Sequence, residues 1–314
     1  MGNHVIVGAG PVGTATALEL VELGHEVTVV TRSGSGPERP GVRRVVGDAS
    51  DPIVLARITA GADVLYNCAN PPYHRWSELW PPLAASLLSA ASESDAGLVI
   101  MGNLYGYGPL DHPMTEDDPL ATTGRKGRVR VAMWSDTLAA HRAGRVRVTE
   151  ARASDFFGPG VVETSFFGRN VAALLAQKRV RTVGDPDVPH SWTYVPDVGR
   201  ALAVLGTDGR AWGRPWHVPT APPRSQRQMA AGFCEAAELP APRLSAVPAT
   251  ALWAAGVFSP QMRELRETRY QFDRPFVLDS SAFTAAFGLE ATPTDEGLRV
   301  ILADARSRGV QPVA

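Results

Sequence analysis

Glycines near the N-terminus have the spacing of a turn that binds a nucleotide pyrophosphate. The turn comprises Gly8, Gly10, Pro11, Val12 and Gly13, in a G-x-G-x-x-G pattern between a β-rich run over 4–7 and a helical pattern over 12–23. The first glycine permits a tight turn, the second lets the backbone approach the pyrophosphate, and the third lets the helix pack closely. The N-terminus of that helix attracts negative charge. We therefore predict a dinucleotide site here, the alternative being a glycine-rich turn without a ligand.

The residues after the second β-rich run, over 26–30, favour a cofactor with a 2′-phosphate. A site that prefers NAD usually has an acid there that binds the ribose hydroxyls. This chain has Thr31, Arg32 and Ser33 instead, and a guanidinium pairs with phosphate through parallel charge-assisted hydrogen bonds. NADP(H) is therefore favoured, with NAD(H) as the alternative, since the segment is rich in arginine and Arg32 can equally be an ordinary loop residue.

Two further groups of residues follow predicted strands. Asp48 and Ala49 come after the run over 42–46, where the carboxylate can accept a hydrogen bond from the adenine amino group or cap the next helix. Asn103, Tyr105 and Tyr107 come after the run over 98–101, at the edge where open α/β sheets bind ligands. Asn103 is suited to bind a substrate oxygen, and either phenol to donate a proton. Packing is the alternative role for Tyr105.

The elements that position these residues alternate between strands and helices. Predicted strands span 4–7, 26–30, 42–46, 63–66, 98–101 and 146–149. A helix within 71–94 is started or interrupted by Pro81 and Pro82. This alternation predicts an α/β fold, a Rossmann-type doubly wound parallel sheet with a smaller C-terminal substrate lobe. We expect the cofactor domain over 1–157, with 193–218 returning to it, and the lobe over 158–192 and 219–314.

Composition narrows the class of protein. The net charge is −1, and the hydrophobic fraction of 44% and charged fraction of 20% are ordinary for a globular chain. No basic stripe favours nucleic acid, and no apolar run is long enough for a membrane span. Two cysteines and seven histidines form no metal-ligand spacing, and no secretion signal opens the chain. We expect a cytoplasmic protein without a metal that binds a small-molecule substrate.

Several motifs together resemble the extended short-chain dehydrogenase/reductase superfamily, and more narrowly its atypical NAD-dependent epimerase/dehydratase-like branch. These are VIVGAGPVG, TRS, GDAS, NCANPPY, IMGNLYGYGP, RASDFFGPG, HSWTYVPDVGRAL and PWHVPT. The resemblance runs nearly from end to end. It implies that Cys68, Ala69 and Asn70 lie beside the cofactor and that Ala153, Ser154 and Asp155 lie near the nicotinamide. Phe157, His190, Trp192 and Tyr194 would line the substrate lobe, although His190 can equally be structural. A homodimer is compatible with it.

The catalytic pair of that family, a Tyr and a Lys four residues apart with an upstream Ser or Thr, is missing here. The segment that aligns with it reads Lys126-Gly-Arg-Val-Arg130, and the upstream positions 101–103 hold no hydroxyl residue. Residues four apart share a helix face, so Lys126 and Arg130 can both point at the nicotinamide ribose and the substrate. Our hypothesis is that Lys126 orients or protonates a substrate carbonyl. The alternative is a solvated basic helix start.

These features predict an NADP(H)-dependent oxidoreductase that acts on a small carbonyl, alcohol or sugar-like substrate. An epimerase or dehydratase that keeps its cofactor through a transient oxidation would use the same site. The missing Tyr/Lys pair motivates a third reading from another class, a non-catalytic NADP(H)-binding redox sensor.

Overall fold

Seven parallel strands form the central sheet, in the order β10-β6-β5-β4-β1-β2-β3. They are β1 (Asn3–Val7), β2 (Glu26–Thr31), β3 (Val42–Val46), β4 (Val64–Asn67), β5 (Gly97–Asn103), β6 (Val148–Ala153) and β10 (Pro215–His217). The computed structural model describes residues 1–161, 165–248, 250, 257 and 266–309. The strand order reverses at β1, so the sheet is doubly wound and its ligand edge lies at the carboxyl ends of the central strands.

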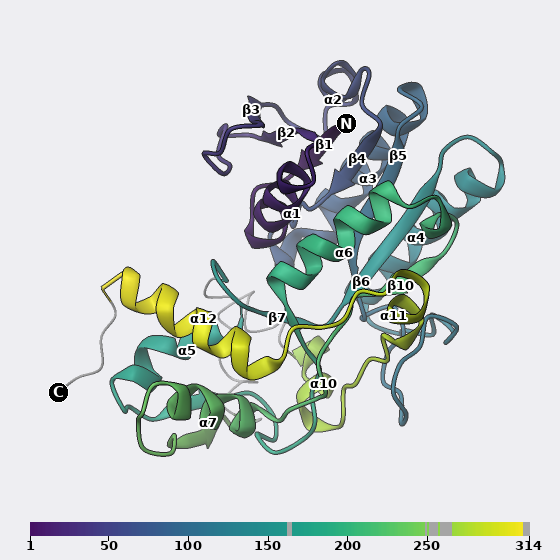
Figure 1. Ribbon diagram of the computed structural model, residues 1–314. Helices are drawn as coiled ribbons and strands as arrows, with labels where there is room; N and C mark the ends of the chain where they lie inside the picture. Colours follow the sequence, from purple (N-terminus) through teal and green to yellow (C-terminus); the bar gives the residue numbers. More distant parts are fainter. Residues whose placement is uncertain (162–164, 249, 251–256, 258–265, 310–314) are drawn as a thin grey trace.

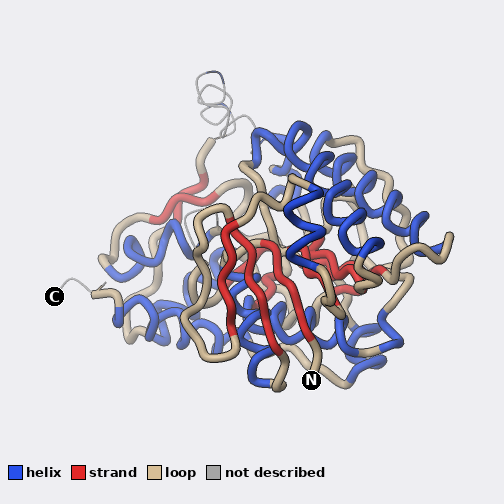
Figure 2. Tube along the Cα trace, turned by 90° about the horizontal axis from the view of Figure 1, so that it is seen from above, coloured by secondary structure: helices blue, strands red, loops and turns tan. Residues whose placement is uncertain are grey.

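Helices cover both faces of this sheet (Figure 2). One face packs against α1 (Pro11–Glu22), α6 (Val195–Thr207) and α11 (Ser281–Phe287), and the other against α2 (Pro52–Thr59), α3 (Trp76–Glu93) and α4 (Arg125–Arg142). Because both faces are buried, the central strands are almost continuously apolar rather than alternating. The predicted Rossmann-type α/β fold is confirmed.

Two predicted elements differ from the structure. Helix α3 begins at Trp76 and continues through Pro81 and Pro82 without a break. Both prolines are exposed, as are the residues whose carbonyls lose a backbone donor, so water can solvate those groups. The last predicted strand is also displaced, because β6 runs from Val148 to Ala153 instead of over 146–149.

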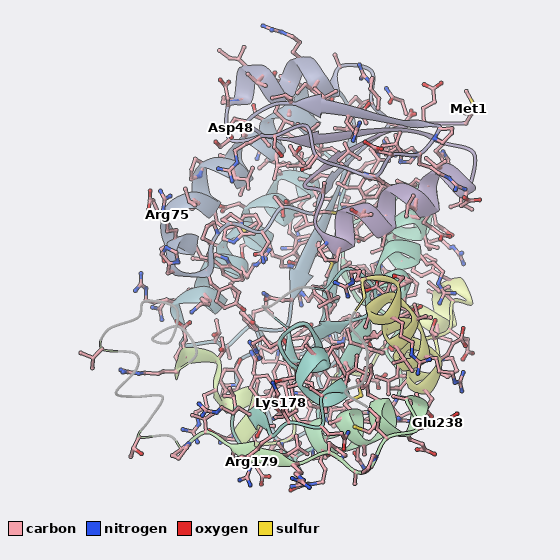
Figure 3. All side chains as sticks on the ribbon, turned by 90° about the vertical axis from the view of Figure 1, so that its left-hand side faces the viewer. Met1, Asp48, Arg75, Lys178, Arg179 and Glu238 are labelled. Carbon is pink, nitrogen blue, oxygen red and sulfur yellow. The ribbon has the colours of Figure 1, made fainter. Side chains whose placement is uncertain are left out.

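A second cluster of elements packs below the sheet (Figures 1 and 3). It contains α5 (Phe166–Leu175), β8 (Val180–Thr182), α7 (Gln226–Ala236), β11 (Leu244–Ala246) and α12 (Thr294–Ser307). Their apolar side chains form a core of their own, which includes Phe167, Phe233 and Leu298. In Figure 3, Asp48 marks the sheet body, and Lys178 and Glu238 mark this cluster. The predicted domain boundaries remain a prediction; within 219–314, Phe283 of α11 packs in the sheet core.

Several short elements complete the fold. The 3-10 turns η1 (Tyr73–Arg75) and η2 (Gly209–Ala211) lie within the sheet body, between β4 and α3 and between α6 and β10. The others are the paired strands β7 (Asp155–Phe157) and β9 (Trp192–Tyr194), and α10 (Tyr270–Asp273). Strand β7 follows β6 directly, so residues at its start lie at the ligand edge of the sheet. Over the described ranges, no helix is both long and apolar enough to cross a bilayer.

Candidate active site

The glycine turn at the carboxyl end of β1 has the geometry of a pyrophosphate cradle. Gly8 has a φ of 103°, which favours glycine, and a Cβ there would lie 2.8 Å from the Cys68 carbonyl oxygen. A Cβ at Gly13 would lie 2.0 Å from the Gly8 carbonyl oxygen, whereas nothing lies within 4 Å of one at Gly10. The start of α1 also has no side-chain cap. Its backbone N–H groups therefore face open space above Gly10, which fits a phosphate ligand.

Hydroxyl groups gather at the end of β2, around the arginine predicted to bind a 2′-phosphate. The Thr31 hydroxyl donates to the Ser35 carbonyl at 3.1 Å, and the Ser33 and Ser35 hydroxyls lie 3.0 Å apart. Arg32 is exposed beside them and contributes to lowering the pKa of Asp48. These hydroxyls and the guanidinium are suited to bind a phosphate.

Asp48 does not cap α2. Its Oδ1 accepts hydrogen bonds from the Ser50 backbone N–H at 3.0 Å and the Ser50 hydroxyl at 2.7 Å, and these bonds are the main cause of its lowered pKa. The cap of α2 is Asp51, which accepts from Ile53 and Val54. Asp48 thus stays ionised beside Arg32, with Ala49 buried behind it.

The end of β4 closes over the glycine turn. The Ala69 backbone N–H donates to Asn67 Oδ1 at 3.3 Å, which shapes the Cys68–Asn70 segment next to Gly8. Burial raises the pKa of the Cys68 thiol to about 12. On the far side of β5, the Ser154 backbone N–H donates to Thr193 Oγ1 at 3.1 Å and anchors the end of β6.

Two phenols meet beyond the end of β5. Asn103 Oδ1 accepts from the Tyr105 backbone N–H at 3.1 Å and so fixes the turn that carries Tyr105. The Tyr105 hydroxyl forms a short hydrogen bond with the Tyr73 hydroxyl of η1. Burial is the main cause of the raised pKa of both phenols, so each stays protonated at neutral pH. Tyr73 was not predicted as a site residue, although it closes the NCANPPY motif just after a strand end.

Lys126 lies beside this phenol pair at the start of α4. Its side chain is 3% exposed, and its Nζ lies 5.1 Å from the centre of the Tyr73 ring. Glu267 accepts from the Lys126 backbone N–H at 2.7 Å and lies 3.4 Å from Nζ. Lys126 is therefore no solvated helix start. Glu267 was not predicted, because it lies in a segment without a recognisable motif.

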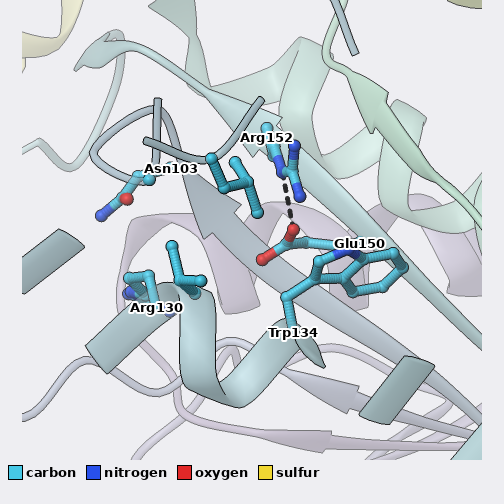
Figure 4. Close-up of a pocket in the computed structure, with 8 residues that line it drawn as sticks. Asn103, Arg130, Trp134, Glu150 and Arg152 are labelled. Atoms are coloured by element: carbon cyan, nitrogen blue, oxygen red, sulfur yellow. Dashed lines mark hydrogen bonds and ion pairs between the residues drawn. The ribbon is translucent and has the colours of Figure 1, made fainter. Parts of the chain in front are cut away.

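Arg130 occupies a different environment from Lys126. Its guanidinium lies 4.7 Å from the centre of the Trp76 ring and 4.3 Å from that of Trp80, and it donates to the Met101 carbonyl at 3.2 Å. Burial lowers its pKa to about 10, so it remains charged. It lines a cavity of about 10 Å³ with Asn103 and Glu150 (Figure 4), which is about the volume of one water. Its predicted contact with substrate remains a prediction.

Tyr107 belongs to a buried polar network behind the site. Its hydroxyl lies 2.7 Å from His217 Nε2 and accepts from Arg152 at 2.7 Å. Arg152 in turn pairs with Glu150 at 2.7 Å, as Figure 4 shows. Burial raises the pKa of Tyr107 to about 12. Tyr107 is 1% exposed and is therefore part of the core. Its predicted contact with substrate remains a prediction.

The other predicted substrate contacts are buried as well. Phe157 and Tyr194 pack against each other with ring centres 5.2 Å apart, and Trp192 donates to the Arg224 carbonyl at 2.7 Å. His190 pairs with Asp155 at 2.9 Å. Asp155 is one-third exposed and electrostatically close to Tyr105, Tyr73, Tyr270 and Arg169. The structure therefore gathers Asp155, Tyr105 and Lys126 near one edge, together with Tyr73 and Glu267.

The sheet is doubly wound, and its carboxyl edge has a glycine turn without a side-chain cap and buried side chains that can donate protons. These features define a dinucleotide-binding enzyme of the Rossmann class. A family model described as the NAD dependent epimerase/dehydratase family matches residues 4–217. The chain belongs to this family, and its expected resemblance is confirmed. Comparison with curated protein sequences gave no match.

Solved structures with the same fold include enzymes that act on nucleotide sugars. MoeE5 in complex with UDP-glucuronic acid and NAD is 22% identical, with a TM-score of 0.80 over 98% of this chain and 100% of its own. UDP-glucose 4-epimerase of Thermotoga maritima, with UDP-glucose, is 17% identical, with a TM-score of 0.79 over 98% and 99%. dTDP-glucose 4,6-dehydratase of Bacillus anthracis, with NAD, is 16% identical, with a TM-score of 0.79 over 99% of each chain. At these identities the likeness shows the fold.

Proposed function

We propose that this protein is an NADP(H)-dependent oxidoreductase that acts on a small carbonyl, alcohol or sugar-like substrate. The observation that carries the proposal is the Tyr105–Tyr73 phenol pair held over Lys126 at the same sheet edge as the glycine turn. When bound, the cofactor supplies or accepts a hydride. A neutral phenol beside that centre can give its proton to the substrate oxygen. The proposal for NADP(H) rather than NAD(H) rests on Arg32 and the three hydroxyls around it.

Each side chain then has a separate task. Tyr105 is the proton donor, and Tyr73 shares its hydrogen bond. Lys126, tied to Glu267, holds the ammonium charge against the Tyr73 ring. Asn103 fixes the turn under Tyr105. The substrate lobe over 158–192 and 219–314 and the homodimer stay proposals of the same kind.

A redox-neutral epimerase or dehydratase is the second candidate. An epimerase oxidises the substrate transiently and returns the hydride to the opposite face of the carbonyl. A dehydratase also removes a proton and a hydroxyl as water before the hydride returns. The dehydratase therefore needs a second proton carrier, a role we assign to Asp155 paired with His190. The family membership supports this candidate equally.

A sensor without catalysis has less support. If it sensed redox state through a thiol, the thiolate would have to form readily. Burial instead raises the pKa of both cysteines in the chain, Cys68 and Cys234. A sensor would have to respond through the cofactor alone.

Cofactor titration tests the proposal. NADPH should bind at least tenfold more tightly than NADH, and Arg32→Asp should weaken NADPH about 10- to 100-fold, because charged hydrogen bonds contribute about 1.5–3 kcal/mol. Arg39→Asp, an exposed arginine paired with Glu22 instead, is the matched control and should leave NADPH affinity unchanged. Preference for NADH in the unmodified protein would overturn the NADP(H) assignment.

Turnover tests the reaction class. Steady NADPH oxidation with members of a panel of small aldehydes, ketones and keto sugars supports the reductase. Tight NADPH binding without turnover across that panel supports the sensor. Isomerisation of a sugar substrate without net NADPH oxidation supports the redox-neutral candidate.

A further inference from the structure

His190 and Asp155 form a hydrogen-bonded pair in which Asp155 is partly exposed to solvent and His190 is buried. His190 is buried, with its ring stacked on Phe272 at 4.9 Å and packed against Trp192 at 4.6 Å. Its Nε2 lies 2.9 Å from Asp155 Oδ2. The Asp155 side chain is 33% exposed, against 1% for His190. Within the described part of the chain, Asp155 is the partner of His190 Nε2 that reaches solvent, which gives the histidine a route for proton exchange.

The partners of the ring fix how many protons it carries. His190 Nδ1 lies 3.1 Å from the Gln271 carbonyl oxygen. A carbonyl only accepts, so Nδ1 must carry a hydrogen. The partner of Nε2 is a carboxylate oxygen, which also only accepts when ionised. The hydrogen bond between Nε2 and Asp155 thus requires one further proton beyond that of a neutral imidazole.

Charged and titratable groups from four neighbouring elements face this pair. Tyr105 follows β5, Tyr73 lies in η1, Tyr270 in α10 and Arg169 in α5. The guanidinium of Arg169 interacts electrostatically with the Asp155 carboxylate, and the two hydrogen bonds of the ring then assign the extra proton to His190 Nε2. The three phenols are neutral and do not alter this balance.

Strand register brings the pair to the reacting edge. Asn103 of β5 is the register partner of Ala153 of β6. Tyr105 and Asp155 each lie two residues further on, so they follow neighbouring strands at equal depth. The charge of Asp155 accordingly acts on the Tyr105 phenol.

We propose that Asp155 and His190 form a proton-holding acid/base pair that serves this site, with Asp155 as the group that exchanges the proton and His190 as its buried reservoir. The role rests on the proposed function. In the reductive direction the Tyr105 O–H bond breaks as the substrate oxygen takes the proton, while the carbonyl carbon takes the hydride. Asp155 then passes the His190 Nε2 proton to the phenolate. The Tyr105 O–H bond re-forms. Asp155 is then a carboxylate and His190 a neutral imidazole whose Nδ1–H still donates to the Gln271 carbonyl, until water returns a proton.

Ring ¹⁵N NMR of histidine-labelled protein at pH 7 tests the pair without cofactor or substrate. His190 should show two protonated ring nitrogens. His217 is the matched buried control, because its Nδ1 faces the Asp279 carbonyl at 2.8 Å but its Nε2 faces the Tyr107 hydroxyl at 2.7 Å, which can donate. It should show one protonated nitrogen. In Asp155→Asn, His190 should lose the Nε2 proton while His217 stays unchanged.

An unmodified protein in which His190 carries a single proton would overturn the proposal, as would an Asp155→Asn variant whose His190 keeps both. With a substrate from the carbonyl panel, Asp155→Asn should lower turnover about 100-fold with NADPH affinity unchanged. Unchanged turnover would also overturn it. Failure of the unmodified protein to bind NADPH would instead remove the oxidoreductase proposal, and the NMR result would stand by itself.

Discussion

Single residues at the sheet edge carry the chemistry, and their burial determines their protonation. Tyr105 and Tyr73 are kept neutral by burial, and Lys126 is held by Glu267. The two phenols are therefore kept in the protonated form that a proton donor needs. Burial lowers the pKa of Arg130 to about 10, but this residue stays charged and packs against two indole rings.

Tyr105→Phe tests the proton donor. We expect turnover to fall about 100-fold with NADPH affinity unchanged, because a general acid contributes roughly that factor and the ring itself remains. Stopped-flow NADPH oxidation and fluorescence titration measure the two quantities. Tyr66→Phe, which removes the hydroxyl of a buried phenol that faces His4, is the control and should retain turnover. Equal losses in both variants would contradict the assignment.

Lys126→Met tests whether the ammonium group of Lys126 contributes to turnover. Turnover should fall at least tenfold while NADPH still binds, since the variant keeps the chain length but loses the charge paired with Glu267. Normal turnover together with normal NADPH binding would remove Lys126 from the mechanism.

At the scale of elements, the β1–α1 unit separates two roles of glycine. Gly13 is required for packing, because a Cβ there would collide with the Gly8 carbonyl, whereas a Cβ at Gly10 meets nothing in the protein. Gly10 is extended with a φ of −68°, so alanine fits its backbone.

Gly10→Ala should therefore leave the melting temperature nearly unchanged and weaken NADPH binding at least tenfold, because the methyl group occupies the space of the pyrophosphate. Gly209→Ala, also with nothing near its Cβ, is the matched control and should change neither. Calorimetry and NADPH titration decide the outcome. Unaltered affinity in Gly10→Ala would place the pyrophosphate elsewhere.

The opposite end of β1 carries a pH-sensitive cluster. His4 lies 3.0 Å from the Tyr66 hydroxyl and 3.1 Å from His25, and burial, followed by the charge of His25, lowers its pKa to about 4. His4 is neutral in the folded chain but takes up a proton below pH 6.5 when unfolded. Its contribution to stability is complete above pH 6.5 and is lost as the pH falls towards 4.

Urea unfolding between pH 7 and 4 should show a loss on the order of 3 kcal/mol from this residue. His4→Asn should flatten that slope. His74→Asn, at an exposed histidine of η1, is the control and should leave the slope in this range as it is. A slope that His4→Asn does not change would rule out the cluster as its cause.

At the scale of the whole molecule, the cofactor should stabilise the sheet body more than the lobe. NADPH at about 100 times its Kd should add about 2.7 kcal/mol to the free energy of unfolding. Hydrogen exchange should slow over 8–14, 31–33 and 67–70 and stay unchanged over α7 and α12. Protection of those two helices instead would contradict the proposed division of the chain.

The sequence by itself determined the alternating strands and helices, the glycine turn and the positions of Lys126 and Tyr105, because these depend on local periodicity and on strand ends. Only the tertiary structure decided their partners. Glu267 meets Lys126 across 141 residues, His217 meets Tyr107 across 110, and His190 meets Asp155 across 35. Contacts between segments so far apart follow from how the sheet is assembled and how the lobe packs on it, which no local pattern specifies. Burial decided charge for the same reason, since it is a property of the packed interior.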